Sequence, residues 1–233
     1  MTILTRLDDN IWTAEGNIVD FYGFAYPTRS VIVRLPNQKL WIWSPITLGP
    51  ELKAEIDALG SPAHLVSPNK IHHLFLPDWK NSYPDAQLWG PHTTIKKRND
   101  LMFAAPLEHD APPQWQNQFE QAWFFGSPFL EEIVFFHRPS RTAILADMSE
   151  NFSETFLAKH WSGWQRWIAR LWGIVEGKGY APLELRLTYF NRKPARAARD
   201  KILGWHPQRV IMAHGRWQAQ NGEQFLKKAF EWI

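Results

Sequence analysis

The sequence predicts an α/β protein folded as a four-layer αββα sandwich, with two mixed sheets inside and helices outside. Two observations support this prediction. Strand-like runs alternate with helical segments, and the order of a sheet followed by helices occurs twice along the chain. The chain has 233 residues, of which 45% are hydrophobic, so a sizeable core can form. We therefore expect one domain over residues 1–233.

The first half begins with a predicted β-meander. Apolar and polar residues alternate through residues 3–43, and Pro36 to Lys39 is typical of a turn between two strands. Residues 49–60 predict a helix, with Pro50 in its first turn and Gly60 at its end. Two short apolar strands follow at 63–68 and 86–91, and the segment 70–79 between them is predicted to be helical.

The second half repeats this order. Strand-like runs occupy residues 119–126, 131–139 and 141–148, and Ser-Pro and Pro-Ser turns separate them. Further elements complete the half: helices are predicted at 151–159, 160–175, 191–205 and 221–233, and a last strand at 208–215.

The composition excludes several classes of protein. A formal charge of +3 is too small to indicate a nucleic-acid partner by itself. The chain has no cysteine, so disulfides and thiolate metal ligands are excluded, which fits a reducing, cytoplasmic location. Residues 1–12 lack the apolar segment of a signal peptide, and no apolar run is long enough for a transmembrane segment.

Ionisable side chains follow three apolar runs. His72 and His73 come after the strand at 63–68, Asp147 follows the run that ends at Ala146, and His214 follows the last strand. Sites assemble at strand ends in layered α/β proteins. Two or three histidines with one carboxylate are a sufficient ligand set for one divalent ion of zinc, iron or manganese.

Four short motifs, in this order along the chain, resemble those of the metallo-β-lactamase superfamily. They are "SPNKIHH" at 67–73, "FFGSPF" at 124–129, "AILADM" at 143–148 and "MAHG" at 212–215. The resemblance is to a divergent, uncharacterised branch of that superfamily, a domain of unknown function, and it runs from about Trp12 to His214. It implies the αββα sandwich that the order of the elements also predicts.

The resemblance implies that one of two metal sites is lost. The superfamily motif Thr-His-x-His-x-Asp-His, laid on residues 67–73, places Pro68 and Lys70 at its first two histidines, and Ser127 stands at the histidine of the Gly-His-Thr loop. The second site keeps residues that can bind a metal: His72, His73, Asp147 and His214. A mononuclear or degenerate metal site is therefore implied.

The function implied is a metal-dependent hydrolase of a small-molecule ester, lactone, amide or phosphoester. Lys70 would replace the charge of the missing cation and polarise a substrate oxygen, and Asp147 would be the second catalytic residue. The alternative is a non-catalytic small-molecule-binding protein that kept the fold and holds no metal. Nothing in the sequence indicates the oligomeric state.

Structural interpretations of the same residues stay open. His72 and His73 suit backbone hydrogen bonding at a helix start, Asp147 suits a helix cap, and His214 before a glycine suits a turn. Residues 150–190 are interpreted as a helical insertion or lid, with apolar residues at helical spacing: Trp161, Trp164, Ile168, Leu171 and Trp172. This face would pack on the domain or cover a pocket, and peripheral membrane contact is the less favoured reading.

Overall fold

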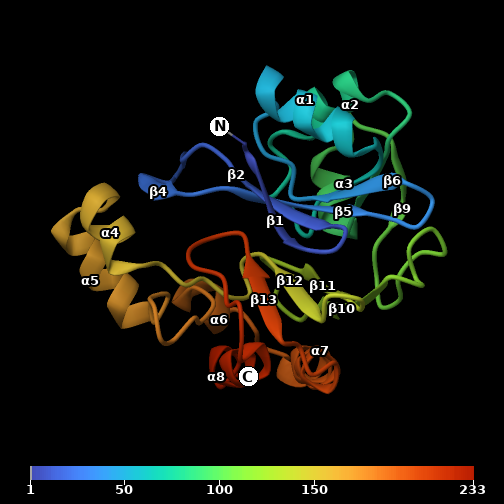
Figure 1. The fold of residues 1–233 in the computed structure, drawn as a ribbon. Helices are drawn as coiled ribbons and strands as arrows, with labels where there is room; N and C mark the ends of the chain where they lie inside the picture. The colour runs from blue at the N-terminus through green and yellow to red at the C-terminus, as the bar shows by residue number, and fades with distance from the viewer. Residues whose placement is uncertain (1) are drawn as a thin grey trace.

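The computed structural model describes residues 2–233 and confirms the four-layer arrangement (Figure 1). The first sheet has seven strands in the order β1-β2-β5-β6-β7-β8-β9. Their bounds are β1 (Leu4–Asp8), β2 (Ile11–Glu15), β5 (Arg29–Arg34), β6 (Lys39–Trp43), β7 (Ser61–Val66), β8 (Gln87–Gly90) and β9 (Phe103–Pro106). The meander from β1 to β6 is antiparallel, and β6 to β9 are parallel.

The second sheet has four strands in the order β10-β11-β12-β13. They are β10 (Phe119–Phe124), β11 (Glu132–His137), β12 (Thr142–Leu145) and β13 (Arg209–Met212), and only the pair β12–β13 is parallel. A separate hairpin of β3 (Val19–Phe21) and β4 (Phe24–Tyr26) extends from the first sheet toward the side of the molecule.

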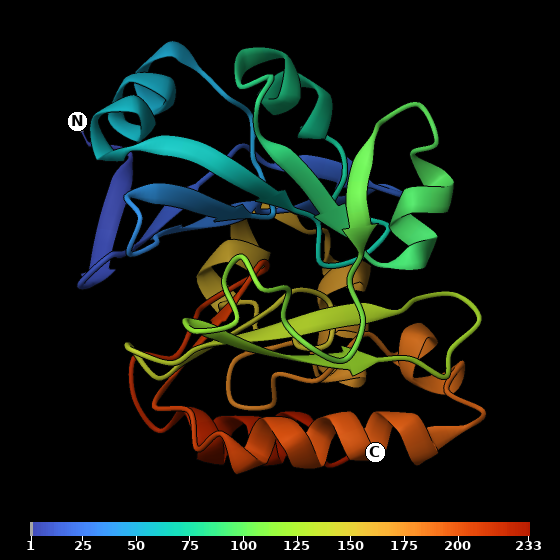
Figure 2. The ribbon, with the colours of Figure 1, turned by 90° about the vertical axis from the view of Figure 1, so that its right-hand side faces the viewer.

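Helices cover the outer faces of both sheets. Figure 2 shows α1 (Pro50–Leu59) and α2 (Leu76–Ser82) above the first sheet, and α7 (Arg192–Gly204) and α8 (Gly222–Ala229) below the second. The remaining helices are α3 (His92–Lys97), α4 (Glu154–His160), α5 (Gly163–Trp172) and α6 (Leu183–Leu187). In the part of the chain that is described, no helix combines the length and apolar character needed to cross a membrane.

Large aromatic side chains fill the space between the two sheets. Trp41 and Trp43 of β6 are fully buried there, and the Trp41 ring lies 4.3 Å from that of Phe119. The rings of Phe135 and Trp115 pack in the same layer. Because inward positions alternate with outward ones along each strand, β6 presents Leu40 and Ile42 to the outer layer instead.

The segment 70–79, predicted to be helical, begins its helix later than expected. Residues 70–75 form turns, and α2 starts only at Leu76. The Oδ1 atom of Asn69 accepts a hydrogen bond from the backbone N–H of Ile71 at 2.8 Å. The hydroxyl of Ser67 donates to the carbonyl oxygens of Asn69 and His72. These side-chain bonds satisfy backbone groups that a helix would otherwise use, so they favour the turn.

Helix α5 carries the tryptophan-rich stretch at the side of the molecule (Figure 1). Trp161, just before the helix, is buried and donates its Nε1–H to the carbonyl oxygen of Ala25 in the hairpin. The buried positions within the helix are Gln165 and Ala169. Trp164 is 60% exposed, so the predicted apolar face packs against the protein only in part.

Candidate metal centre

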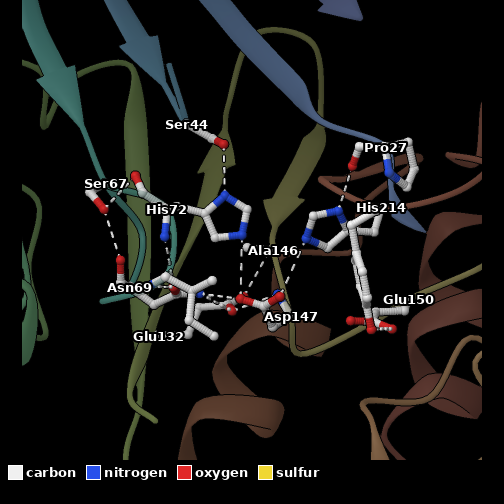
Figure 3. A network of polar contacts seen from close by, with 12 residues as sticks. Pro27, Ser44, Ser67, Asn69, His72, Glu132, Ala146, Asp147, Glu150 and His214 are labelled. Carbon is white, nitrogen blue, oxygen red and sulfur yellow. Dashed lines mark hydrogen bonds and ion pairs between the residues drawn. The ribbon is translucent and has the colours of Figure 1, made fainter. Parts of the chain in front are cut away.

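Three of the predicted site residues meet at the carboxyl ends of strands from both sheets (Figure 3). Leu145 of β12 pairs with Met212 of β13 in parallel register, so Asp147 and His214 follow their strands at the same level. His72 reaches the same point from the turn after β7. One ligand atom from each of these side chains lies within 4.8 Å of the other two.

The carboxylate of Asp147 lies between the two imidazoles. His72 Nε2 is 3.3 Å from Asp147 Oδ2, and His214 Nε2 is 3.4 Å from Asp147 Oδ1. The two imidazole rings are 5.3 Å apart. All three side chains are less than 10% exposed, so the cluster is held in a largely desolvated place.

The other nitrogen of each imidazole has a partner that orients the ring. His214 Nδ1 donates to the carbonyl oxygen of Pro27 at 2.7 Å, so in the neutral ring Nε2 carries the lone pair. His72 Nδ1 lies 2.8 Å from the hydroxyl of Ser44, which can accept its proton in the same way. Such contacts fix a histidine for metal binding.

Two residues that the sequence analysis did not single out hold Asp147 in place. Glu132, at the start of β11, accepts hydrogen bonds from the backbone N–H groups of Ala146 at 2.8 Å and Asp147 at 2.7 Å. The Asn69 amide nitrogen donates to Glu132 Oε2 at 3.0 Å and to Asp147 Oδ2 at 2.6 Å. One neutral donor therefore joins two buried carboxylates.

The pKa values of these two carboxyl groups move in opposite directions. Burial raises the pKa of Glu132 to about 7, and the nearby charge of Asp147 adds to the rise. Burial also acts to raise the pKa of Asp147, but His72 and His214 outweigh it and hold that pKa well below its ordinary value. Asp147 is therefore the ionised member of the pair at neutral pH.

The structure groups three of the four expected ligands and does not bring His73 into the cluster. His73 follows His72 in the turn and points elsewhere: its Nδ1 lies 3.3 Å from Arg98 Nη1. Burial, with the charges of Lys97 and Arg98, lowers the pKa of His73 to about 4. Adjacent residues in a tight turn direct their side chains differently, so only one histidine of the pair faces the site.

Lys70 and Ser127 also lie outside the cluster. Lys70 is half-buried and is not among the residues that line the cavity described below, so its catalytic role stays a prediction. The hydroxyl of Ser127 forms a 2.6 Å hydrogen bond with that of Thr188. Ser127 thus stabilises the contact between the loop before β11 and the residue after α6.

A cavity of about 510 Å³ opens onto His72, Asp147 and His214. The β3–β4 hairpin, the turn after β7, the loop before β11 and α6 form its walls. From the predicted insertion at 150–190, the lining residues are Glu150, Pro182, Glu184, Leu185 and Thr188. None of the described residues of α5 lines the cavity, so the lid role predicted for its tryptophans stays untested.

Two further polar groups stand beside the cluster. The hydroxyl of Tyr26 donates to Glu150 Oε2 at 3.4 Å, and the Tyr26 ring lies 4.9 Å from the ring of His214. Burial raises the pKa of Glu150 well above its ordinary value, and the carboxylates of Asp147 and Glu184 add to the rise.

The donor atoms of the cluster fit a divalent metal ion. His72 Nε2 is buried and has no hydrogen-bond partner among the residues that are described, which is costly for a polar atom unless something binds it. Two imidazole nitrogens and a carboxylate are ligands that zinc, iron and manganese accept. The Asn69 amide occupies the space between Asp147 and the neighbouring Glu132, so Glu132 is engaged by a donor and is not part of the group of possible ligands.

Comparison with known families shows to which family the chain belongs. The family described as "Domain of unknown function (DUF4336)" matches residues 8–158, well over half of the sequence. The chain belongs to this family. The matched region includes His72 and Asp147 and ends before His214. No curated protein matches the chain.

Solved structures with a similar fold include metallo-β-lactamases and an oxidoreductase. DIM-1 metallo-β-lactamase is similar at a TM-score of 0.63 with 12% identity, over 97% of this chain and 95% of that one. A metallo-β-lactamase from Hirschia baltica gives 0.60 with 13% identity, over 97% and 94%. Rubredoxin oxygen:oxidoreductase from Desulfovibrio gigas gives 0.65 with 14% identity, over 98% of this chain but 61% of that longer one. These identities establish a shared fold.

Proposed function

We propose that this protein is a metal-dependent hydrolase that acts on a small molecule, with one divalent ion held by His72, Asp147 and His214. The observation that carries the proposal is the convergence of His72 Nε2 and His214 Nε2 on the buried carboxylate of Asp147, at 3.3 and 3.4 Å. A bound ion would supply Lewis acidity, which polarises a carbonyl or phosphoryl oxygen and activates water.

The residues around the cluster support such a reaction. Ser44 and Pro27 keep the two imidazoles turned toward Asp147. Glu132 fixes the backbone that carries the Asp147 side chain. The enclosing cavity limits water near the reacting atoms, and this strengthens electrostatic interactions there. An ester, lactone, amide or phosphoester is the reaction class that suits these groups.

Metal analysis combined with hydrolysis assays tests the proposal. The purified protein is loaded with zinc, iron or manganese, dialysed, and assayed with chromogenic esters, lactones, amides and phosphoesters. We expect about one ion per chain and metal-dependent turnover of at least one class. His214→Ala should lose the bound ion and the turnover. His73→Gln, at the histidine outside the cluster, should keep the ion and the turnover. A protein that binds no metal would support the alternative, a binding protein without catalysis.

A further inference from the structure

The walls of the cavity differ in polarity from its floor, which His72, Asp147 and His214 form. The walls are mainly apolar and aromatic, with Phe21, Tyr22, Leu74 and Phe129 among the residues that form them. These four remain exposed, Tyr22 by 88% and Phe129 by 62%. Exposed apolar groups gathered around a concave site are typical of a surface that an apolar ligand covers.

The charges along the same lining have one sign. Asp20, Asp147, Glu150 and Glu184 line the cavity, and no Lys or Arg of residues 2–233 does. Arg29 of β5, which is buried, pairs with Glu15 and donates to a backbone carbonyl. An anionic substituent on the apolar part of a ligand would therefore find no Lys or Arg side chain in the lining and would meet the carboxylates of Asp20 and Glu184.

The floor offers a place for a polar group of a ligand. His72 is more than nine-tenths buried, lines the cavity, and leaves its Nε2 without a hydrogen-bond partner. A neutral donor such as a hydroxyl can approach this nitrogen in the metal-free protein, and the carbonyl of an ester would face a bound ion, while an apolar chain or ring covers the walls. A volume of about 510 Å³ suits a compound of small to medium size.

We propose that the cavity selects hydrophobic compounds without a negative charge, and that the substrate is an uncharged ester, lactone or amide with an extended apolar group. This inference rests on the proposed function, because the His72–Asp147–His214 cluster forms the floor of the cavity. It narrows the substrate class: compounds that carry a carboxylate or phosphate on the apolar group, away from the reacting bond, are disfavoured, since no Lys or Arg side chain of the lining neutralises them.

Calorimetric binding of matched probes tests the proposal without measuring turnover. The probes are 4-phenylbutanol, 4-phenylbutylamine and 4-phenylbutyrate, which share an apolar group and differ in charge, and each is titrated into metal-free protein, because a bound zinc ion would itself bind the carboxylate. We expect the alcohol to bind at least about tenfold more tightly than the carboxylate, and the amine no more weakly than the carboxylate. Equal or tighter binding of the carboxylate, or no binding of any probe, would overturn the proposal.

A charge reversal at the wall provides the matched variant. Glu184 is exposed on α6 and lines the cavity, so Glu184→Lys supplies the missing cation without a buried change. This variant should bind 4-phenylbutyrate several-fold more tightly than the wild type. Glu51→Lys makes the same charge change on the exposed surface of α1, away from the cavity, and should leave binding unchanged. If Glu51→Lys improves carboxylate binding as much as Glu184→Lys does, the lining does not set the preference.

The proposed substrate preference and the proposed hydrolase activity can fail separately. The predicted order of the probes in a protein that holds no metal would support the substrate preference and contradict the hydrolase. A metal-binding protein that takes the carboxylate as well as the alcohol would keep the hydrolase and remove the preference.

Discussion

The amide of Asn69 offers a direct test of how the site is stabilised, through the variant Asn69→Ala. The change removes hydrogen bonds of 2.6 Å to Asp147 and 3.0 Å to Glu132, both carboxyl groups being buried. A hydrogen bond to a charged group contributes about 1.5–3 kcal/mol. We therefore expect the free energy of unfolding to fall by about 3–5 kcal/mol at pH 8, a large share of a typical total.

The free energy of unfolding that Asn69→Ala loses should be smaller at lower pH. The pKa of Glu132 is raised from 4.5 to about 7 in the folded protein, so the folded state binds the proton more tightly than the unfolded state. The stabilisation from protonating Glu132 is complete below about pH 4.5 and is lost as the pH rises through 7. Without the amide this pKa rises further, and the cost of Asn69→Ala should be about 1 kcal/mol less at pH 6 than at pH 8.

Urea unfolding at both pH values, with a chelator present, measures these differences. Asn151→Ala is the matched control, because Asn151 is equally buried but its side chain donates only to the neutral carbonyl oxygen of Arg216, at 2.8 Å. The control should cost about 1 kcal/mol, independent of pH. The reasoning is refuted if Asn69→Ala costs no more than the control and shows no dependence on pH.

Three further predictions concern stability and metal affinity. Burial lowers the pKa of His137 from 6.5 to about 4, so His137 should account for up to about 3 kcal/mol of the stability that is lost as the pH falls from 6.5 to 4, and His137→Gln should lessen that loss by this amount in pH-dependent urea unfolding. Gly215→Ala should lower the melting temperature sharply, because its φ is +89° and a Cβ would lie 2.2 Å from a backbone oxygen, whereas Gly204→Ala, in open space, should not. Ser44→Ala should weaken zinc binding about tenfold in competition titrations, since the hydroxyl orients His72; unchanged affinity would exclude that role.

Much of the fold could be predicted because its elements are long and strongly patterned. The helices at 49–60 and 191–205 were expected close to where α1 and α7 lie, and the strands of the second sheet match their apolar runs. The short helices α3 and α6 were not predicted, since each has too few residues for a periodic pattern. Helix α6 matters because it forms part of the cavity wall.

The site could be predicted only in part, for reasons of local geometry. His72, Asp147 and His214 follow strands whose carboxyl ends meet, and their order along the chain indicated that they could meet in space. Which histidine of the pair at 72–73 faces the site depends on a turn that the Asn69 side chain stabilises, and spacing alone does not show this. The sequence does contain an indication of the role of Glu132, because a carboxylate at the start of a fully buried strand requires polar partners.

Metal stoichiometry after equilibrium dialysis tests the central claim most directly. Wild type and Asp147→Asn are dialysed against zinc, iron or manganese, and bound metal is measured by mass spectrometry. The arrangement of His72, Asp147 and His214 predicts close to one ion per wild-type chain and little or none in the variant, which keeps the side-chain shape but loses the charged ligand. A wild-type protein that retains no more metal than Asp147→Asn would contradict the account.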